Sequence, residues 1–294
     1  MRQRALRSPQ AQNLLSTPPL SLPSIDRITQ KGRKLGDTAD YMVRRAIHRD
    51  PPVHLPAHRQ IIQGLEYEGV FACPVSHLRL SSTKAFLSDA RRAAAELRDL
   101  TPETAPPLEY PGDFTHCIPL NPSHVAREYP ALYMWGLDHE ILDLVENTIG
   151  TRITYHGLII RKELVDNQMI GTRFWHLDCE DYDTTRISIY LSDVLEPDDG
   201  AFEYVPRIKS PSYADFGPGV DLARIDDATL ERLVPRWQWQ SCLGPAETAI
   251  FAVTSRVFHH GRLPRTERIA ASYYYTSDRP LNPTLARRFS FRTG

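Results

Sequence analysis

The feature that most constrains the fold is a change of hydrophobic period near Gly150. Before this glycine, apolar residues recur with the 3.6-residue period of helices, and after it they follow the two-residue period of half-buried strands. The later segments are rich in Ile, Val, Tyr, Phe and Thr, and turn sequences such as 196–200 separate them. We expect strands over 152–161, 170–178, 186–194, 201–206, 247–253, 256–259 and 268–276.

Helices should precede these strands. The strongest helical pattern covers 83–100, a second helix is expected over 138–148 with its end at Gly150, and a short helix should lead into a strand near 61–70. The apolar stripe of the first consists of Phe86, Leu87, Ala90, Ala94 and Leu97. Helices followed by many short strands predict an α+β chain, predominantly β, whose sheet part is an antiparallel sandwich or barrel.

The chain divides into an extension over 1–57 and a main domain over 58–294. The extension is basic and contains 7 of the 24 prolines, and residues 1–60 carry 11 Lys and Arg against 4 Asp and Glu. We interpret it as a solvated arm with a short helix over 38–48, the alternatives being a targeting peptide or a segment that binds an anionic partner.

One long insertion, 208–244, interrupts the strand-rich half. It holds a single helical piece, 226–234, before Pro235. Long connections in compact domains are usually functional or mobile. We therefore interpret this insertion as a candidate lid over a binding site.

Composition excludes several classes of protein. Apolar residues make up 41% and charged residues 24% of the 294, which is typical of a globular chain. The net charge of −1 does not indicate a nucleic-acid partner, and no run approaches the ~18 apolar residues of a membrane span. Four cysteines without metal-binding or redox spacing, and no secretory signal pattern, favour a reducing compartment, and we expect a cytoplasmic protein.

The motif with the clearest chemistry is His176-Leu177-Asp178. On a strand, residues two apart project to the same face, so an imidazole and a carboxylate would lie side by side. These are two of the three ligands of a 2-His-1-carboxylate site for Fe(II). The spacing alone is weak, because roughly one such match is expected by chance in a chain of this composition. Another match, His48-Arg49-Asp50, lies in the basic extension with no strand around it.

A third histidine and an arginine complete the pattern. His259 and His260 end a strand-like run, and on a strand these neighbours would face opposite ways, so the residues themselves leave the choice between them open. Arg268 begins the next strand. A guanidinium at the start of a buried strand needs an anionic partner, which a carboxylate ligand would supply.

Taken together, these residues resemble the phytanoyl-CoA dioxygenase-like branch of the Fe(II)/2-oxoglutarate oxygenases. The resemblance covers about 58–276 and rests on the order His-x-Asp, Tyr-Leu-Ser-Asp-Val, an Asp-Gly turn into Phe-x-Tyr-Val-Pro, a distal His and a following Arg. Two departures are that Pro206 is followed by Arg-Ile-Lys rather than Gly-Ser-His, and that the distal His lies slightly closer to the Arg than is common in the family.

The resemblance implies a double-stranded β-helix, a jelly-roll of two facing sheets braced by N-terminal helices. It implies that His176, Asp178 and His259 bind Fe(II), His259 being favoured because related sequences place the ligand directly after a Thr-Ser-Arg-like run. It also implies that Arg268 binds the far carboxylate of 2-oxoglutarate, with Tyr190 as a further contact. A carboxylate ligand at Asp178 distinguishes the chain from related halogenases, which carry a small residue there.

The implied activity is an O2-dependent oxidation. The enzyme would hydroxylate, desaturate or cyclise a C–H bond of a small to medium organic molecule, such as a specialised metabolite or amino-acid derivative, and release succinate and CO2. Two alternatives remain open: a jelly-roll hydrolase or isomerase using Zn(II) or another divalent ion, and a relative that binds a ligand without catalysis. Arg268 argues against the first and the intact triad against the second.

Residues around the motif receive more ordinary interpretations. Cys179 is expected to be a packed thiol that points away from the metal. Arg173 and Arg186 are interpreted as solvated strand ends, with an anionic substrate as the alternative. The acidic loop of Glu180, Asp181 and Asp183 is either a polar turn or a contact for a cationic substrate. The runs 273–275 and 237–239 are interpreted as ordinary packing, or else as the wall of a substrate pocket.

Overall fold

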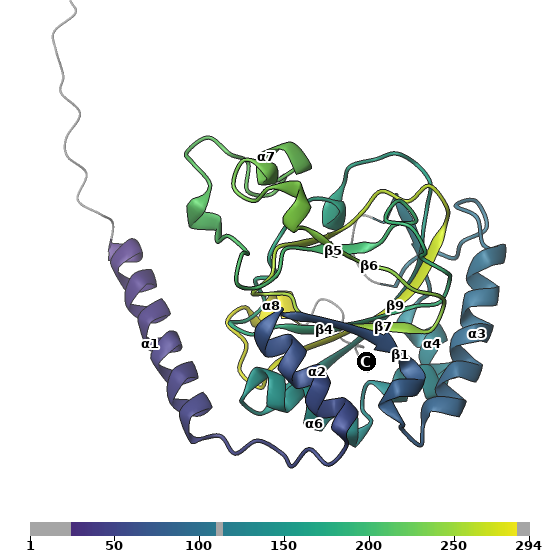
Figure 1. Cartoon of the computed structure of the whole chain (residues 1–294), viewed down its shortest axis with the longest axis horizontal. Coiled ribbons are helices and arrows are strands. Elements are labelled where there is room, and N and C mark those ends of the chain that lie inside the picture. The colour runs from purple at the N-terminus through teal and green to yellow at the C-terminus, as the bar shows by residue number, and fades with distance from the viewer. Residues whose placement is uncertain (1–24, 110–113, 287–294) are drawn as a thin grey trace, which may run out of the picture. The chain divides into compact units, whose positions relative to one another are not determined.

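A computed structural model describes residues 25–109 and 114–286, with only the backbone of 25–35 (Figure 1). The chain divides into two units, the first ending at Arg44 and the second beginning at Arg45. Helix α1 (Ile25–Ile47) contains this boundary and covers most of the expected helix 38–48. Expectations for residues 1–24 lie outside the described chain. Within the described residues, no helix has both the length and the apolar character needed to cross a membrane.

The second unit is built on a six-stranded antiparallel sheet, which we call the major sheet. Its strand order is β1-β7-β4-β9-β3-β2, so β4 and β9, which come from distant parts of the sequence, lie at its centre. Its strands are β1 (Val70–Pro74), β2 (Cys117–Pro119), β3 (Ile153–Glu163), β4 (Thr185–Tyr190), β7 (Thr248–Val253) and β9 (Arg268–Ser277).

A shorter antiparallel sheet, the minor sheet, faces the major one (Figure 1). It has the order β6-β5-β8, with β5 (Phe202–Tyr204), β6 (Gln240–Cys242) and β8 (His259–Gly261). Residues of both sheets, among them Tyr190, Ile250 and Ala270 of the major and Cys242 of the minor, form an apolar cluster. Two facing antiparallel sheets with helices on one side confirm the predicted α+β jelly-roll.

Helices cover the outer face of the major sheet, on the side opposite β5 and β6 (Figure 1). The inward stripe of the long helix, which includes Phe86, Ala90 and Leu97, packs in one core with Ile187 and Phe251 of the sheet. Each large apolar side chain buried in this way contributes roughly 1.5–3 kcal/mol. The helices are α2 (Pro56–Tyr67), α3 (Thr83–Asp99), α4 (Pro122–Glu128), α5 (Pro130–Trp135) and α6 (His139–Ile149).

Nearby side chains and a glycine determine where these helices begin and end. The side chain of Asp138 accepts a hydrogen bond from the Glu140 N–H at the start of α6, and Gly150, with φ of 73°, ends it as predicted. At the end of α3, the buried Lys162 Nζ donates to the carbonyl of Leu100 at 2.7 Å. A cation at a helix C-terminus also complements the helix dipole.

Several expectations about the strands were wrong. Residues 170–178 do not form a strand: a 3-10 turn (Gly171–Arg173) is followed by isolated bridges at Trp175 and His176. Residues 256–258 of the expected strand 256–259 are not in a strand, and the strand begins only at His259. Strands β2 and β6 were not expected at all, because three residues are too few to show an alternation.

The insertion 208–244 is more ordered than its sequence indicated. It contains α7 (Asp227–Glu231), two 3-10 turns and β6, and the last helix of the described chain is α8 (Pro283–Ala286). Apolar residues of the insertion form their own core with residues before β4, after β5 and before β8, and its members are Trp175, Val205, Ile225, Leu230, Val234, Trp239 and Phe258. The insertion is therefore a packed layer rather than a structureless loop.

Candidate metal centre

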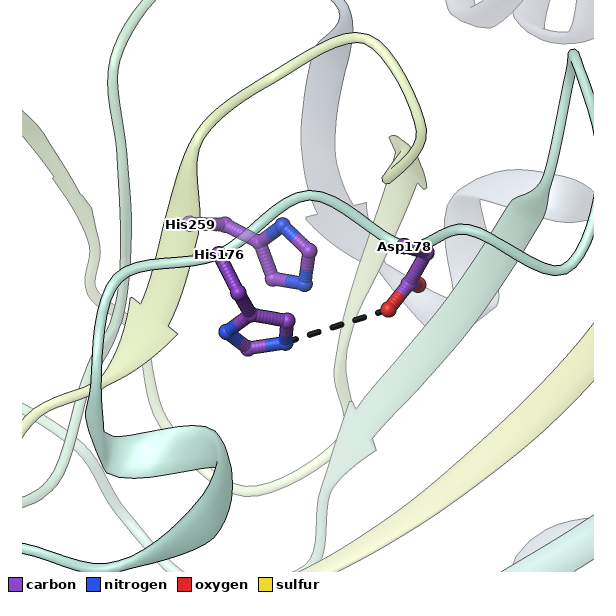
Figure 2. A group of neighbouring side chains, drawn as sticks. All are labelled: His176, Asp178 and His259. Atoms are coloured by element: carbon purple, nitrogen blue, oxygen red, sulfur yellow. Dashed lines mark ion pairs between the residues drawn. The ribbon is translucent and has the colours of Figure 1, made fainter. Parts of the chain in front are cut away.

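Two segments far apart in the sequence are paired so that three side chains converge. The backbone N–H groups of His176 and His259 each donate to the other residue's carbonyl at 3.0 Å, and the Asp178 N–H donates to the Thr254 carbonyl at 3.0 Å. This pairing extends the minor sheet beyond β8. It places His176, Asp178 and His259 side by side (Figure 2).

The three side chains have the spacing and orientation of metal ligands. One ligand atom from each lies within 4.8 Å of the others, a spacing that one ion can bridge. The Nδ1 atoms of His176 and His259 contact the carbonyl oxygens of Phe174 and Val257 at 2.8 and 3.0 Å. A carbonyl only accepts, so each Nδ1 carries the proton and each Nε2 keeps its lone pair, as metal-binding histidines require.

Electrostatics favour the same protonation state. Burial lowers the pKa of His259 to about 3, with a further contribution from His176, whose own pKa burial also lowers. Burial opposes ionisation of Asp178, but Arg186 and the two histidines outweigh it and lower the pKa of that carboxyl to about 2. Two neutral imidazoles and one carboxylate are a donor set that fits Fe(II), and equally Zn(II) or other divalent ions.

The structure also separates the two adjacent histidines. His260 points away from the triad: its Nε2 contacts Glu203 Oε2 at 2.9 Å and its Nδ1 contacts the Arg173 carbonyl at 3.0 Å. Its ring stacks on Trp175 with centroids 4.0 Å apart. Both ring nitrogens of His260 are engaged by the protein, whereas His259 joins His176 and Asp178.

A cavity of about 400 Å³ opens beside the triad, and the inner face of the major sheet forms its floor. Strand registry brings residues of β4 and β9 to this floor: Arg186 pairs with Tyr274, and Ser188 with Ser272. Arg268 and Tyr190 also border the cavity. The sequence-predicted metal ligands and the predicted cosubstrate contacts therefore share one cavity.

Arg268 is held at the edge of this cavity. Its Nη1 donates to the Gly200 carbonyl, and its Nη2 lies 3.5 Å from Glu163 Oε1. Its Nε has no hydrogen-bond partner among the described residues. Tyr190 presents its ring to the cavity, because its hydroxyl donates to the Cys242 carbonyl at 3.0 Å and accepts from the Phe202 N–H at 2.8 Å.

Arg186 is the residue that sequence reasoning missed. It is not a solvated strand end: its Nε lies 2.5 Å from Asp178 Oδ2, its Nη2 lies 3.4 Å from Glu180 Oε1, and its guanidinium covers the Tyr274 ring at 4.4 Å. It therefore holds the carboxylate oxygen that faces away from His176. The only signal in the sequence was an arginine at the start of a strand that directly follows the motif.

Arg173 is likewise buried, contrary to expectation. It is 2% exposed, pairs with Asp166 and Glu163, and donates to the carbonyls of His116 and Leu164 at 3.2 and 2.9 Å. Burying a guanidinium requires this many partners. Its role is to fix the turn that precedes Trp175.

Among the residues that follow Asp178, Cys179 differs from its interpretation, whereas Asp181 and Asp183 fit the polar turn. Cys179 does not belong to the triad, but its thiol is exposed at the cavity rather than packed. Asp181 accepts hydrogen bonds from the N–H groups of Tyr182, Ser277 and Leu281, and Asp183 pairs with two arginines. Among the acids of this loop, Glu180 borders the cavity.

The three tyrosines of the run 273–275 point to different faces of the sheet, because side chains alternate along a strand. Tyr274 borders the cavity, while Tyr273 and Tyr275 point into the helix-covered core and donate to the carbonyls of Leu132 and Gly136. In the insertion, Trp239 is buried whereas Trp237 is 75% exposed.

The insertion contacts the segment that carries two of the candidate metal ligands. The Tyr213 hydroxyl accepts from the Leu177 N–H at 3.0 Å and lies 3.2 Å from the Leu177 carbonyl, and Trp175 Nε1 donates to Asp227 Oδ1 at 2.8 Å. These contacts flank His176 on both sides. The insertion therefore helps to position the candidate ligands.

Comparisons with known proteins agree on the fold. No family model and no curated protein matches the sequence. Among solved structures, EctD from S. alaskensis, crystallised with 2-oxoglutarate and 5-hydroxyectoine, is 16% identical over 79% of this chain and 80% of its own, with a TM-score of 0.51. The α-ketoglutarate-dependent carbocyclase SnoK from nogalamycin biosynthesis is 17% identical over 78% of this chain and 88% of its own, with a TM-score of 0.50. The chain thus has the fold of these two proteins.

Proposed function

We propose that the protein is an Fe(II)- and 2-oxoglutarate-dependent oxygenase of the phytanoyl-CoA dioxygenase-like type. The observation that carries this proposal is that His176, Asp178 and His259 share one cavity with Arg268. A metal site alone fits many activities. A metal site with a buried guanidinium across the same cavity fits a cosubstrate that binds a metal and also bears a distant carboxylate.

In this proposal, the triad holds Fe(II), which supplies the O2-dependent oxidising chemistry. The chain's own residues bind and orient the reactants. Arg186 keeps Asp178 Oδ2 engaged, which leaves Oδ1, 3.8 Å from His176 Nε2, as the oxygen available to the ion. Binding through one oxygen leaves more positions open for the cosubstrate than binding through two.

The charges near Arg268 also fit a dicarboxylate. Arg161, Arg173 and Arg268 share the carboxylates of Glu163 and Asp166. This group of buried and partly buried side chains carries one positive charge in excess. The far carboxylate of 2-oxoglutarate would balance it, with the Tyr190 ring packed beside the guanidinium.

The proposed reaction is oxidation of a C–H bond in a small to medium organic molecule, with release of succinate and CO2. EctD and SnoK, by their descriptions, use 2-oxoglutarate as ligand or cosubstrate, which supports the choice of cosubstrate. We further propose that the insertion 208–244 helps to exclude water from the cavity, because it clamps the segment around His176.

Anaerobic visible absorbance tests the proposal. The purified protein should give a weak charge-transfer band when both Fe(II) and 2-oxoglutarate are present, and not with either alone. His176→Ala should abolish the band and Arg268→Ala should weaken it at a fixed cosubstrate concentration. His139→Ala is a suitable control, because this side chain is 84% exposed and lies outside the triad. Absence of the band with Zn(II) still bound at the triad would favour the hydrolase or isomerase alternative instead.

A further inference from the structure

His116 is a buried polar side chain that the proposed chemistry does not use. It directly precedes β2 and is 4% exposed. Its carbonyl oxygen accepts hydrogen bonds from the Leu164 N–H at 3.0 Å and from Arg173 at 3.2 Å, so its backbone is held from two sides. Neither ring nitrogen has a hydrogen-bond partner among the described residues. Native proteins retain few such groups, and each needs an explanation.

The ring of His116 borders the same cavity as the triad and Arg268. Next to it lies Gly171, whose φ is 56° and where an added Cβ would come within 3.8 Å of His116 Cε1. Thr172, the next residue, accepts a hydrogen bond from Arg161 Nη2 at 3.3 Å. The wall around His116 is thus polar, and no side chain on Gly171 covers the ring.

In the proposed function, the metal ion and 2-oxoglutarate neutralise the charged side chains that line this cavity. The excess positive charge near Arg268 would be balanced by the far carboxylate of 2-oxoglutarate. At the triad there is instead an excess of negative charge, because Arg186 is shared by the carboxylates of Asp178 and Glu180. The positive metal ion would balance this excess. The substrate therefore meets no unmatched charge of either sign in this wall.

The imidazole of His116 is suited to a neutral group. Burial lowers its pKa, and Arg161 and Arg173 lower it further, against the opposing effects of Glu163 and Asp166. A neutral ring offers one N–H donor and one lone pair. A hydroxyl group, which both donates and accepts, complements this pair directly.

We propose that His116 hydrogen-bonds a hydroxyl group of an uncharged primary substrate bound in this cavity. The inference rests on the proposed function, because the matched charges assume a metal ion and 2-oxoglutarate. It names the substrate class as neutral hydroxylated molecules rather than carboxylic acids or amines. His116 is accordingly a substrate-binding residue and not part of the cosubstrate site.

Nitrogen NMR of the ¹⁵N-histidine-labelled protein, loaded with Zn(II) and 2-oxoglutarate, tests this assignment. The probes are cyclohexanol, cyclohexanecarboxylate and cyclohexylamine, which share a ring and differ in charge. Cyclohexanol should shift the His116 ring resonances, which are identified by their loss in His116→Gln. The two charged probes should leave these resonances in place.

Two variants separate the role of the ring from its contribution to packing. His116→Phe removes donor and acceptor and should weaken cyclohexanol binding about tenfold, the loss expected for one hydrogen bond. His116→Gln keeps a donor and an acceptor, so its affinity for cyclohexanol should stay within about threefold of the wild type. In both variants the affinities for Zn(II) and 2-oxoglutarate should be unchanged.

Several outcomes would overturn the proposal. Tighter binding of either charged probe, or no shift of the His116 resonances with cyclohexanol, would contradict the assigned substrate class. A fall of 2-oxoglutarate affinity in His116→Phe would assign the residue to the cosubstrate instead. Failure of the proposed function would appear separately, as the absence of the Fe(II) and 2-oxoglutarate band in the wild-type protein.

Discussion

The two faces of the major sheet are made of the same strands but have different roles. On the outer face, Ile187, Phe251 and Tyr273 pack under the helices in a continuous apolar core. On the inner face, one residue away along the same strands, Arg186 and Tyr274 border the cavity. Because strand side chains alternate, a single register assigns one set of residues to stability and the next to binding.

The difference shows how a charged floor is tolerated inside the jelly-roll. The guanidiniums of the inner face are paired with carboxylates, whereas the outer face needs no such pairing because its residues are apolar. Changes on the outer face should therefore alter the free energy of unfolding. Changes to the charged residues of the inner face should alter ligand binding more than stability.

The largest expected effect belongs to the outer face. Phe251→Ala removes a fully buried ring from the core and should lower the free energy of unfolding by about 3–5 kcal/mol, measured by urea denaturation. At temperatures where the variant remains folded, its Zn(II) affinity should match that of the wild type. A folded variant with strongly reduced metal affinity would show that the outer face also affects ligand binding, which contradicts the separation of roles.

Arg186→Gln tests the inner face. Residues that orient a metal ligand typically contribute about 10–100-fold to metal affinity, and Arg186 is the residue that holds Asp178 Oδ2. Competition titration with Zn(II) should show a loss in this range. Arg91→Gln, which removes an exposed arginine paired with Glu247, is the matched control. Equal affinities in the two variants would show that Arg186 does not position the ligand.

The pH dependence of stability tests the neutral state of the buried histidines. The folded state lowers the pKa of His259 from 6.5 to about 3, so below pH 6.5 the unfolded chain takes up a proton that the folded chain does not. Stability of the metal-stripped protein should fall as pH falls, by about 1.4 kcal/mol per pH unit for this residue. His259→Gln should reduce the slope between pH 6 and 5, as followed by urea denaturation. An unchanged slope would contradict the assignment.

The smallest effect is expected where the inner face is polar but uncharged. Ser188→Ala removes the hydroxyl contact to Ser272 at 3.0 Å and should lower the free energy of unfolding by about 0.5–1.5 kcal/mol. Calorimetric titration should show an affinity for 2-oxoglutarate within about threefold of the wild type. A larger change would place Ser188 among the cosubstrate contacts.

Local sequence patterns predicted most of this sheet and singled out His176 and Asp178, but not the pairing that brings the candidate ligands together. The strands around Ile187, Phe251 and Tyr273 were recognisable because they are short runs rich in Ile, Val, Tyr, Phe and Thr between turn sequences. The residues His176 and Asp178 do converge, although they lie beside an isolated bridge and not on a strand. Their convergence comes from pairing with the segment before β8, which no local pattern reveals.

The pairing of side chains that become neighbours only through folding was the part that could not be predicted. Arg186 and Arg173 looked like exposed strand ends, because the carboxylates that pair with them become neighbours only through folding. The choice between His259 and His260 has the same origin: it depends on Glu203, which lies in another strand. The core of the insertion likewise depends on Trp175, more than 30 residues earlier in the sequence.

The central claim is that one cavity holds a metal ion at the triad and 2-oxoglutarate at Arg268 together. It is tested most directly by calorimetric titration of 2-oxoglutarate into His176→Ala, Arg268→Ala and the double variant, each with and without Zn(II) as the redox-inert ion. We predict that Zn(II) strengthens cosubstrate binding in the wild type, and that His176→Ala removes this gain. Losses in the double variant should also be smaller than the sum of the single losses. Equal 2-oxoglutarate affinity with and without Zn(II), or additive losses, would contradict the claim.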